Sequence, residues 1–164
     1  MPGWIRPLIL TAALLAVAAP AGGALAQAAP APAPAAPKTI NGSPMTQVPF
    51  AEHPFPLSDD GTYREFLSKV AADVRRRCGR LESFGWEFPK GDQAKLDRIF
   101  ESTMDSFKAA GWAAKAVEAR SVQNPDMLVF LADKEKRQLL MVWLPMPDAA
   151  MLIMCETDGS GSAR

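Results

Sequence analysis

Three short apolar runs near the end of the chain constrain its fold most strongly. They are Met127–Ala132, Leu139–Leu144 and Ala149–Cys155, each six or seven residues long, which is a normal strand length and too short for a stable helix. A polar segment separates the first two runs, and Pro145 and Pro147 lie between the second and the third, which argues against one continuous helix. Because short connections make neighbouring strands antiparallel, we predict an antiparallel meander.

The three runs are apolar throughout and lack the alternation of a sheet with one solvated face. Continuous apolar strands are typical of a sheet that is covered on both faces. The sequence therefore predicts a cover for each face. Helices would supply one. The segment Ile40–Leu57, a second copy of the chain, or a protein or lipidic partner would supply the other.

A first amphipathic helix is predicted after residue 61. Thr62 and Glu65 have the spacing of a capping box, and Gly79 is a natural stop because it tolerates positive φ. One apolar stripe recurs at steps of three and four: Tyr63, Phe66, Leu67, Val70, Val74 and Cys78.

A second helix is predicted from Asp92, as its N-cap, to Gly111, as its stop, with Trp112 placed for a Schellman-type contact. Between the helices, Leu81–Lys90 is interpreted as a packed loop or short extended piece. Ala113–Val122 is interpreted as a polar edge strand, with continued helix as the alternative. The stripe of the second helix is Leu96, Ile99, Phe100, Thr103, Phe107 and Ala110.

The predicted fold class is α+β. Two amphipathic helices would pack on one face of a four-stranded antiparallel meander, in the order ααββββ, within a single domain at residues 58–158. The tail 159–164 is predicted to be disordered.

The first 26 residues have the pattern of a secretory signal peptide. Arg6 precedes an apolar run from Leu8 to Ala19, and small residues end at Ala26, after which we expect cleavage. An uncleaved anchor is the alternative. Residues 27–57 are an Ala/Pro-rich linker whose second part, from Lys38, carries aromatic residues and either docks on the domain or is disordered. This pattern predicts a periplasmic protein with no stable membrane span after cleavage.

The two cysteines, Cys78 and Cys155, are expected to form a disulfide in an oxidising compartment. Cys78 lies on the stripe of the first helix, which would direct it toward the strand that ends at Cys155. Two buried free thiols are the alternative.

Composition excludes several classes of partner and cofactor. The 18 basic and 18 acidic residues cancel, so there is no general attraction to nucleic acid. The methionines in the apolar runs are typical of core packing rather than of a copper site, and we expect no metal and no cofactor.

Catalytic motifs are not apparent. The single histidine, His53, lies in the Pro-rich segment, and no nucleophile elbow, phosphate loop or metalloprotease motif occurs. Asp59 and Asp60 precede a helix, where acids complement its dipole. Glu82 and Glu87 are a conceivable but unspecific carboxylate pair.

The remaining candidate surface consists of four arginines and two tryptophans, which could contact an anionic or protein partner: Arg75, Arg76, Arg77, Arg80, Trp86 and Trp143. Solvated cations at a helix end are the simpler interpretation of the arginines. The leading functional hypothesis is an exported, non-enzymatic interaction module that self-associates or binds a protein through an apolar sheet face. A carrier of an apolar small molecule or lipid is the alternative, and a small hydrolase using Glu82, Glu87 or His53 is third.

Overall fold

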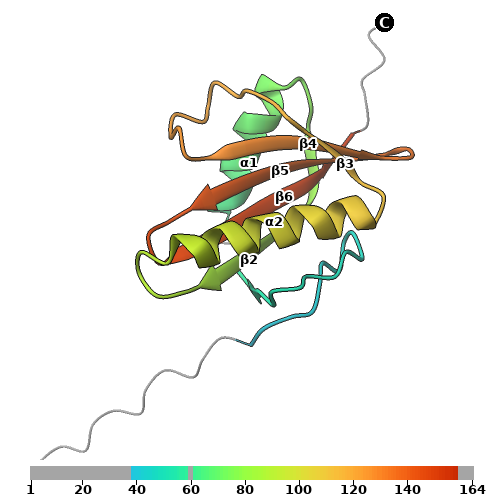
Figure 1. Ribbon diagram of the computed structural model, residues 1–164. Helices are drawn as coiled ribbons and strands as arrows, with labels where there is room; N and C mark the ends of the chain where they lie inside the picture. Colours follow the sequence, from blue (N-terminus) through green and yellow to red (C-terminus); the bar gives the residue numbers. More distant parts are fainter. Residues whose placement is uncertain (1–37, 59–60, 159–164) are drawn as a thin grey trace, which may run out of the picture. The chain divides into compact units, whose positions relative to one another are not determined.

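The computed structural model describes residues 38–58 and 61–158 (Figure 1). The predicted signal peptide, the Ala/Pro stretch up to residue 37, Asp59, Asp60 and the tail 159–164 lie outside the described residues. Within the described part, no helix is long and apolar enough to cross a membrane.

The sheet has six antiparallel strands in the spatial order β1-β2-β6-β5-β4-β3. The three apolar runs form β4, β5 and β6, which confirms their prediction as antiparallel strands. The four-stranded meander in the order ααββββ is wrong, because two more strands join the sheet and one of them lies between the helices. The elements are β1 Phe55–Pro56, α1 Thr62–Asp73, β2 Cys78–Glu87, α2 Gln93–Ala109, β3 Ala113–Ala116, β4 Leu128–Lys134, β5 Arg137–Pro145 and β6 Ala149–Thr157.

The longer of the two strands that the sequence pattern missed is β2. It pairs with β6 along most of its length, from Leu81 opposite Cys155 to Glu87 opposite Ala149. Its glycines and charged residues hide the alternation that would identify a strand. Gly85 has a structural reason, because a Cβ built there would lie 2.7 Å from the ring of Phe55 on β1. Gly85 therefore weakens the sequence signal of a strand but allows β1 to pair closely with β2.

The two helices lie on opposite faces of the sheet, not on one face as predicted. Figure 1 shows α2 in front of the sheet and α1 behind it. Alternate residues of each strand point to the two faces: on β5, Met141 and Trp143 pack with α2, whereas Leu140 and Val142 pack with α1. This arrangement explains why the runs are apolar throughout and leaves no bare sheet face for a second copy or ligand in the described part of the chain.

The segment 38–57 packs on the same face as α2. Met45, Val48 and Phe50 are buried there, and the Phe50 ring lies 5.0 Å from the Phe84 ring of β2. An isolated bridge between Gly42 and Pro49 folds the segment back on itself. The segment is therefore part of the hydrophobic core of this domain.

Helix α1 differs from its prediction at both ends. Gly61 is the N-cap, and the Glu65 carboxylate pairs with Lys69 instead of completing a capping box. The helix ends at Asp73, because Arg75 adopts a positive φ of 57° and the Arg76 amide bonds to the Ala71 carbonyl. An arginine thus takes the left-handed position that the sequence pattern assigned to Gly79.

Helix α2 confirms its predicted boundaries. The Asp92 side chain accepts a hydrogen bond from the Lys95 amide at 2.9 Å. At the other end, Gly111 has a φ of 86°, and the Trp112 amide bonds to the Phe107 carbonyl as in a Schellman motif.

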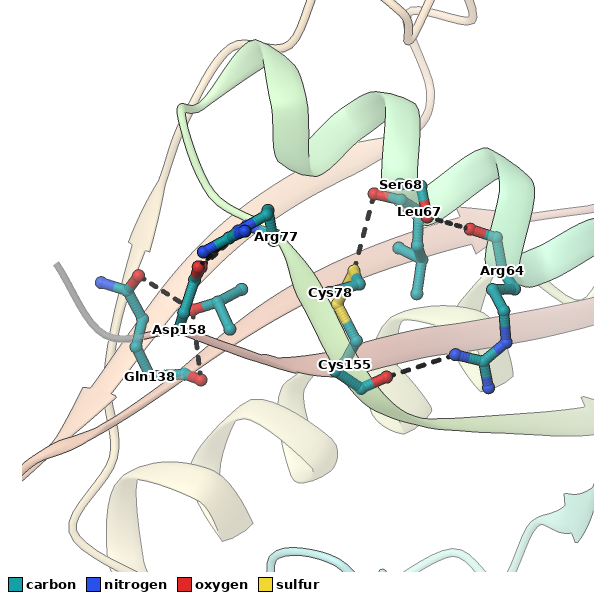
Figure 2. Close-up of a disulfide and its surroundings, with 10 residues drawn as sticks. Arg64, Leu67, Ser68, Arg77, Cys78, Gln138, Cys155 and Asp158 are labelled. Atoms are coloured by element: carbon teal, nitrogen blue, oxygen red, sulfur yellow. Dashed lines mark hydrogen bonds and ion pairs between the residues drawn. A yellow bond between two sulfur atoms is a disulfide. The ribbon is translucent and has the colours of Figure 1, made fainter. Parts of the chain in front are cut away.

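The predicted disulfide is present between Cys78 and Cys155. Cys78 is the first residue of β2 rather than a helical residue, so the bond joins two neighbouring strands across an irregularity in their register. Figure 2 shows the bond beneath α1, with the Leu67 carbonyl oxygen 3.6 Å from the Cys78 sulfur. The pairing is therefore as predicted, although the geometry that we expected to produce it is not.

Candidate functional site

The arginines of the candidate surface lie in the connection between α1 and β2 and at the start of β2. The Arg76 Nε donates to the Gln138 Oε1 at 2.6 Å, and the Arg77 Nε donates to Asp158 at 2.9 Å. Figure 2 shows Arg77 directed at Asp158. The Arg77 backbone N–H and guanidinium bonds lower the pKa of Asp158. Arg76 and Arg77 therefore have side-chain partners at this end of the sheet, and Arg75, Arg77 and Arg80 are all exposed to solvent.

The two tryptophans of that surface are not part of it. Trp86 and Trp143 are buried on the α2 face, with ring centroids 5.7 Å apart. Trp86 lies near the end of β2, whereas Cys78 and the arginines lie at its start. The six residues thus belong to two separate places, a solvated end of the sheet and the hydrophobic core.

The single histidine lies in a small pocket of about 250 Å³. A partly buried ion pair joins Glu52 and Lys95 at 2.6 Å, and Glu87 lies at the pocket edge. The lining is Thr39, Glu52, His53, Phe55, Trp86, Glu87, Lys95 and Ile99. His53 and Glu87 come together here, as a hydrolase would require, but no side-chain partner orients His53 among the described contacts, whereas a catalytic base is normally oriented by another group.

Glu82 lies elsewhere. It is five positions from Glu87 on the same strand, which places their Cα atoms about 16 Å apart along β2 and their side chains on opposite faces. Glycosidase pairs are separated by about 5–9.5 Å, so this pair does not fit. Glu82 instead accepts a 2.6 Å hydrogen bond from Ser43. In the described part of the chain there is also no group of three or more histidine, cysteine, aspartate or glutamate residues able to hold a metal ion, and no free cysteine.

The feature that stands out is the edge of the sheet formed by β3. All four residues, Ala113 to Ala116, are exposed, and β4 pairs with only one side of the strand. The Val117 amide bonds to the Val129 carbonyl, in line with the register of β3 and β4. Hydrogen-bonded pairs alternate along an antiparallel ladder, so the N–H and C=O groups of Ala114 and Ala116 point away from β4.

Two hollows border this edge. A hollow of about 380 Å³ lies on the α2 side, and a second, of about 450 Å³, lies beside the connection from β3 to β4. The first is lined by Met104, Asp105, Lys108, Trp112, Ala113 and Ala114. The second is lined by Ala116, Val117, Glu118, Ala119, Val122, Asn124, Pro125, Met127, Leu128 and Val129. Leu128 is the one large hydrophobic residue that is exposed, at 41%, among the described residues.

Charges of both signs lie around the β3 edge. Lys108 and Lys115 are exposed, and the Lys134 ammonium lies 6.0 Å from the Trp112 ring centroid. Asp105 and Glu118 supply negative charge at the two hollows. We call the exposed strand and its two hollows the β3 groove.

The sequence indicated an edge strand in this region but not a binding groove. The available signal was a run of small side chains, Ala113 and Ala114 followed by Lys115 and Ala116, directly after a helix stop. Small residues leave the backbone accessible, yet the hollows depend on side chains from α2 and from the connection to β4, which only the fold brings together.

Comparisons with known proteins add no assignment. The chain matches no family model, and neither a curated protein nor a solved structure is significantly similar to it.

Proposed function

We propose that this chain is an exported, periplasmic interaction module without enzymatic activity, and that it binds another protein through the β3 groove. The observation that carries the proposal is that both faces of the sheet are covered while the β3 edge is open and bordered by two hollows. Exposed strand edges pair readily with other chains, and small proteins commonly use them for recognition.

Two features support export. Residues 1–26 have the pattern of a signal peptide, and the disulfide joins the only two cysteines of the chain. Disulfides persist in oxidising compartments such as the periplasm. The leader and the disulfide thus favour the same location.

The carrier hypothesis receives less support than it did from the sequence. Its proposed site was a gap between sheet and helix lined by Met, Leu and Phe, and in the fold Met141, Met154 and Phe107 fill that space and are fully buried. The interaction module therefore remains the better hypothesis, with the groove replacing the apolar sheet face as its binding surface.

Photo-crosslinking in the intact envelope tests this function. A photoreactive side chain at Ala113 in the groove should capture one specific protein, and the same side chain at Lys90 should not. Both positions are exposed, but Lys90 lies in the connection between β2 and α2. Equal products from both positions, or no specific product from Ala113, would contradict the proposal.

A further inference from the structure

The structure assigns a partner chemistry to the β3 groove: an extended peptide segment that adds to β3 as an antiparallel strand and carries an acidic residue opposite Lys115, with apolar residues opposite Ala114 and Val117. This inference rests on the proposed function and deepens it. It names how the partner is held and which residues of the partner are recognised.

The backbone of β3 is available for a seventh strand. Ala114 and Ala116 each present an N–H and a C=O away from β4, so an added strand would form two pairs of main-chain hydrogen bonds. The methyl side chains allow close approach. Antiparallel addition continues the pattern of the whole sheet and is slightly more stable per residue than parallel pairing.

Side-chain recognition follows from the register. Ala114 pairs with Ala132, which is buried on the α2 face, so a partner residue opposite Ala114 lies on that face beside the 380 Å³ hollow. Val117 and Val129 pack on the α1 face, so a residue opposite Val117 lies beside the 450 Å³ hollow. In strand addition, such alternate pockets supply specificity while the main chain supplies affinity.

Lys115 is the reason for assigning an acidic residue to the partner segment. Its side chain is exposed and has no ion pair in the described part of the chain, and an oppositely charged residue directly across an antiparallel pair is stabilising. Lys108 adds positive charge near one hollow, where Asp105 offsets part of it, and Glu118 lies near the other. From its N-terminus, the partner segment therefore has an apolar residue opposite Val117, any residue opposite Ala116, an acidic residue opposite Lys115 and an apolar residue opposite Ala114.

A second copy of this chain is a poorer occupant. The two-fold register that uses both Ala114 and Ala116 of each copy places Lys115 directly opposite Lys115 of the other copy. Like charges at directly opposed positions destabilise a strand pair. Lys115 therefore favours an acidic partner over self-association, in the way that edge lysines commonly block unwanted pairing.

Peptide titration followed by NMR tests the inference on the purified, disulfide-bonded protein. The probe is the capped peptide Thr-Val-Thr-Glu-Val-Thr, and its control has Lys in place of Glu. The Glu peptide should shift the amide signals of Ala114 and Ala116 in a saturable way, and the Lys peptide should bind about fivefold to tenfold more weakly. Lys115→Glu should reverse that preference.

A proline substitution separates strand addition from simple surface contact. Ala116→Pro removes an outward N–H that does not bond to β4, and prolines are tolerated on edge strands at such positions; Ala116→Ser keeps the N–H. The proline variant should lose peptide binding with an unchanged unfolding midpoint, and the serine variant should bind normally.

The outcomes distinguish this inference from the proposed function. Binding that is unchanged by Ala116→Pro, or equal for the Glu and Lys peptides, overturns strand addition with acidic selectivity. If a photoreactive side chain at Ala113 nevertheless captures one specific protein in the envelope, the interaction module stands with a different mode of binding. If neither the peptide nor an envelope protein contacts the groove, both proposals fall.

Discussion

Two buried tryptophans differ in the contacts of their indole N–H groups. The Trp86 Nε1 donates to the Glu52 carbonyl at 2.8 Å, whereas the Trp112 Nε1 is buried without a hydrogen-bond partner in the described part of the chain. Both side chains are at most 4% exposed. An unpaired buried donor is costly. Other contacts therefore hold Trp112 in place, including a cation–π contact with the Arg137 guanidinium, which lies 5.4 Å from the ring centroid.

Phenylalanine substitutions test that difference. Trp86→Phe removes a hydrogen bond and should lower the free energy of unfolding by about 1 kcal/mol more than Trp112→Phe. Urea denaturation of the two variants and the native protein measures both values. An equal loss, or a larger loss for Trp112→Phe, would contradict the assigned contacts.

Asp73 links α1 to the connection that borders the β3 groove. Its carboxylate accepts the Ser121 backbone N–H at 2.6 Å, and bonds from Ser121 lower the pKa of Asp73 from 3.8. Because the pKa is lower in the folded state, this contribution to stability is present above the unfolded pKa and is lost as the pH falls through the folded pKa.

Asp73→Asn should therefore be less stable than the native protein near neutral pH, with a difference that shrinks as the pH falls below about 4. Thermal unfolding at a series of pH values measures the difference. A difference that stays constant down to the lowest accessible pH would show that the charge of Asp73 contributes nothing.

At the scale of elements, the disulfide fixes the pairing of β2 with β6. These strands are far apart in the chain, since the two cysteines are separated by 77 positions. On the chain-entropy model, closing a loop of that length stabilises the fold by about 4 kcal/mol, a large share of the ~5–15 kcal/mol typical of a domain.

Replacing both cysteines with alanine should lower the free energy of unfolding by about 4 kcal/mol. Alanine avoids placing a hydroxyl at the fully buried Cys155 position. Chemical denaturation of the double variant, and of the native protein with reductant, should give similar losses. A variant as stable as the oxidised protein would contradict this role.

Some elements were predictable because one local signal determines them. Three contiguous apolar runs with proline or charged connections specify β4, β5 and β6, and Asp92 and Gly111 specify the ends of α2. The strand β2 was not predictable in this way. Gly85 allows the close approach of Phe55, and the charged residues of β2 interrupt the alternation that would indicate a strand. An amphipathic stripe shows that a helix packs on a sheet but not on which face.

At the scale of the whole molecule, the segment 38–57 completes the core next to α2. Phe50 contacts the rings of Phe84, Trp86 and Phe107 and is 3% exposed. Phe50→Ala should therefore lower the free energy of unfolding by about 3–5 kcal/mol, whereas the exposed control Lys38→Ala should have little effect. Denaturant unfolding of both variants tests this; equal stability would mean that the segment is not part of the core.

The candidate site was less predictable than the fold. The sequence indicated an edge strand at Ala113–Val122. The predicted binding surfaces, however, were an apolar sheet face that the fold covers and a set of arginines and tryptophans that the fold separates. The β3 groove depends on Met104 from α2, Leu128 from β4 and the small residues between them. No local pattern reports that such distant residues meet.

We propose above that this protein binds a partner along the β3 edge. The most direct measurement is photo-crosslinking from position 113 in the intact envelope, compared between the Ala116→Pro and Ala116→Ser backgrounds. We expect one specific product that is retained with serine and lost with proline. A product of equal yield in both backgrounds, or no specific product in either, would contradict it.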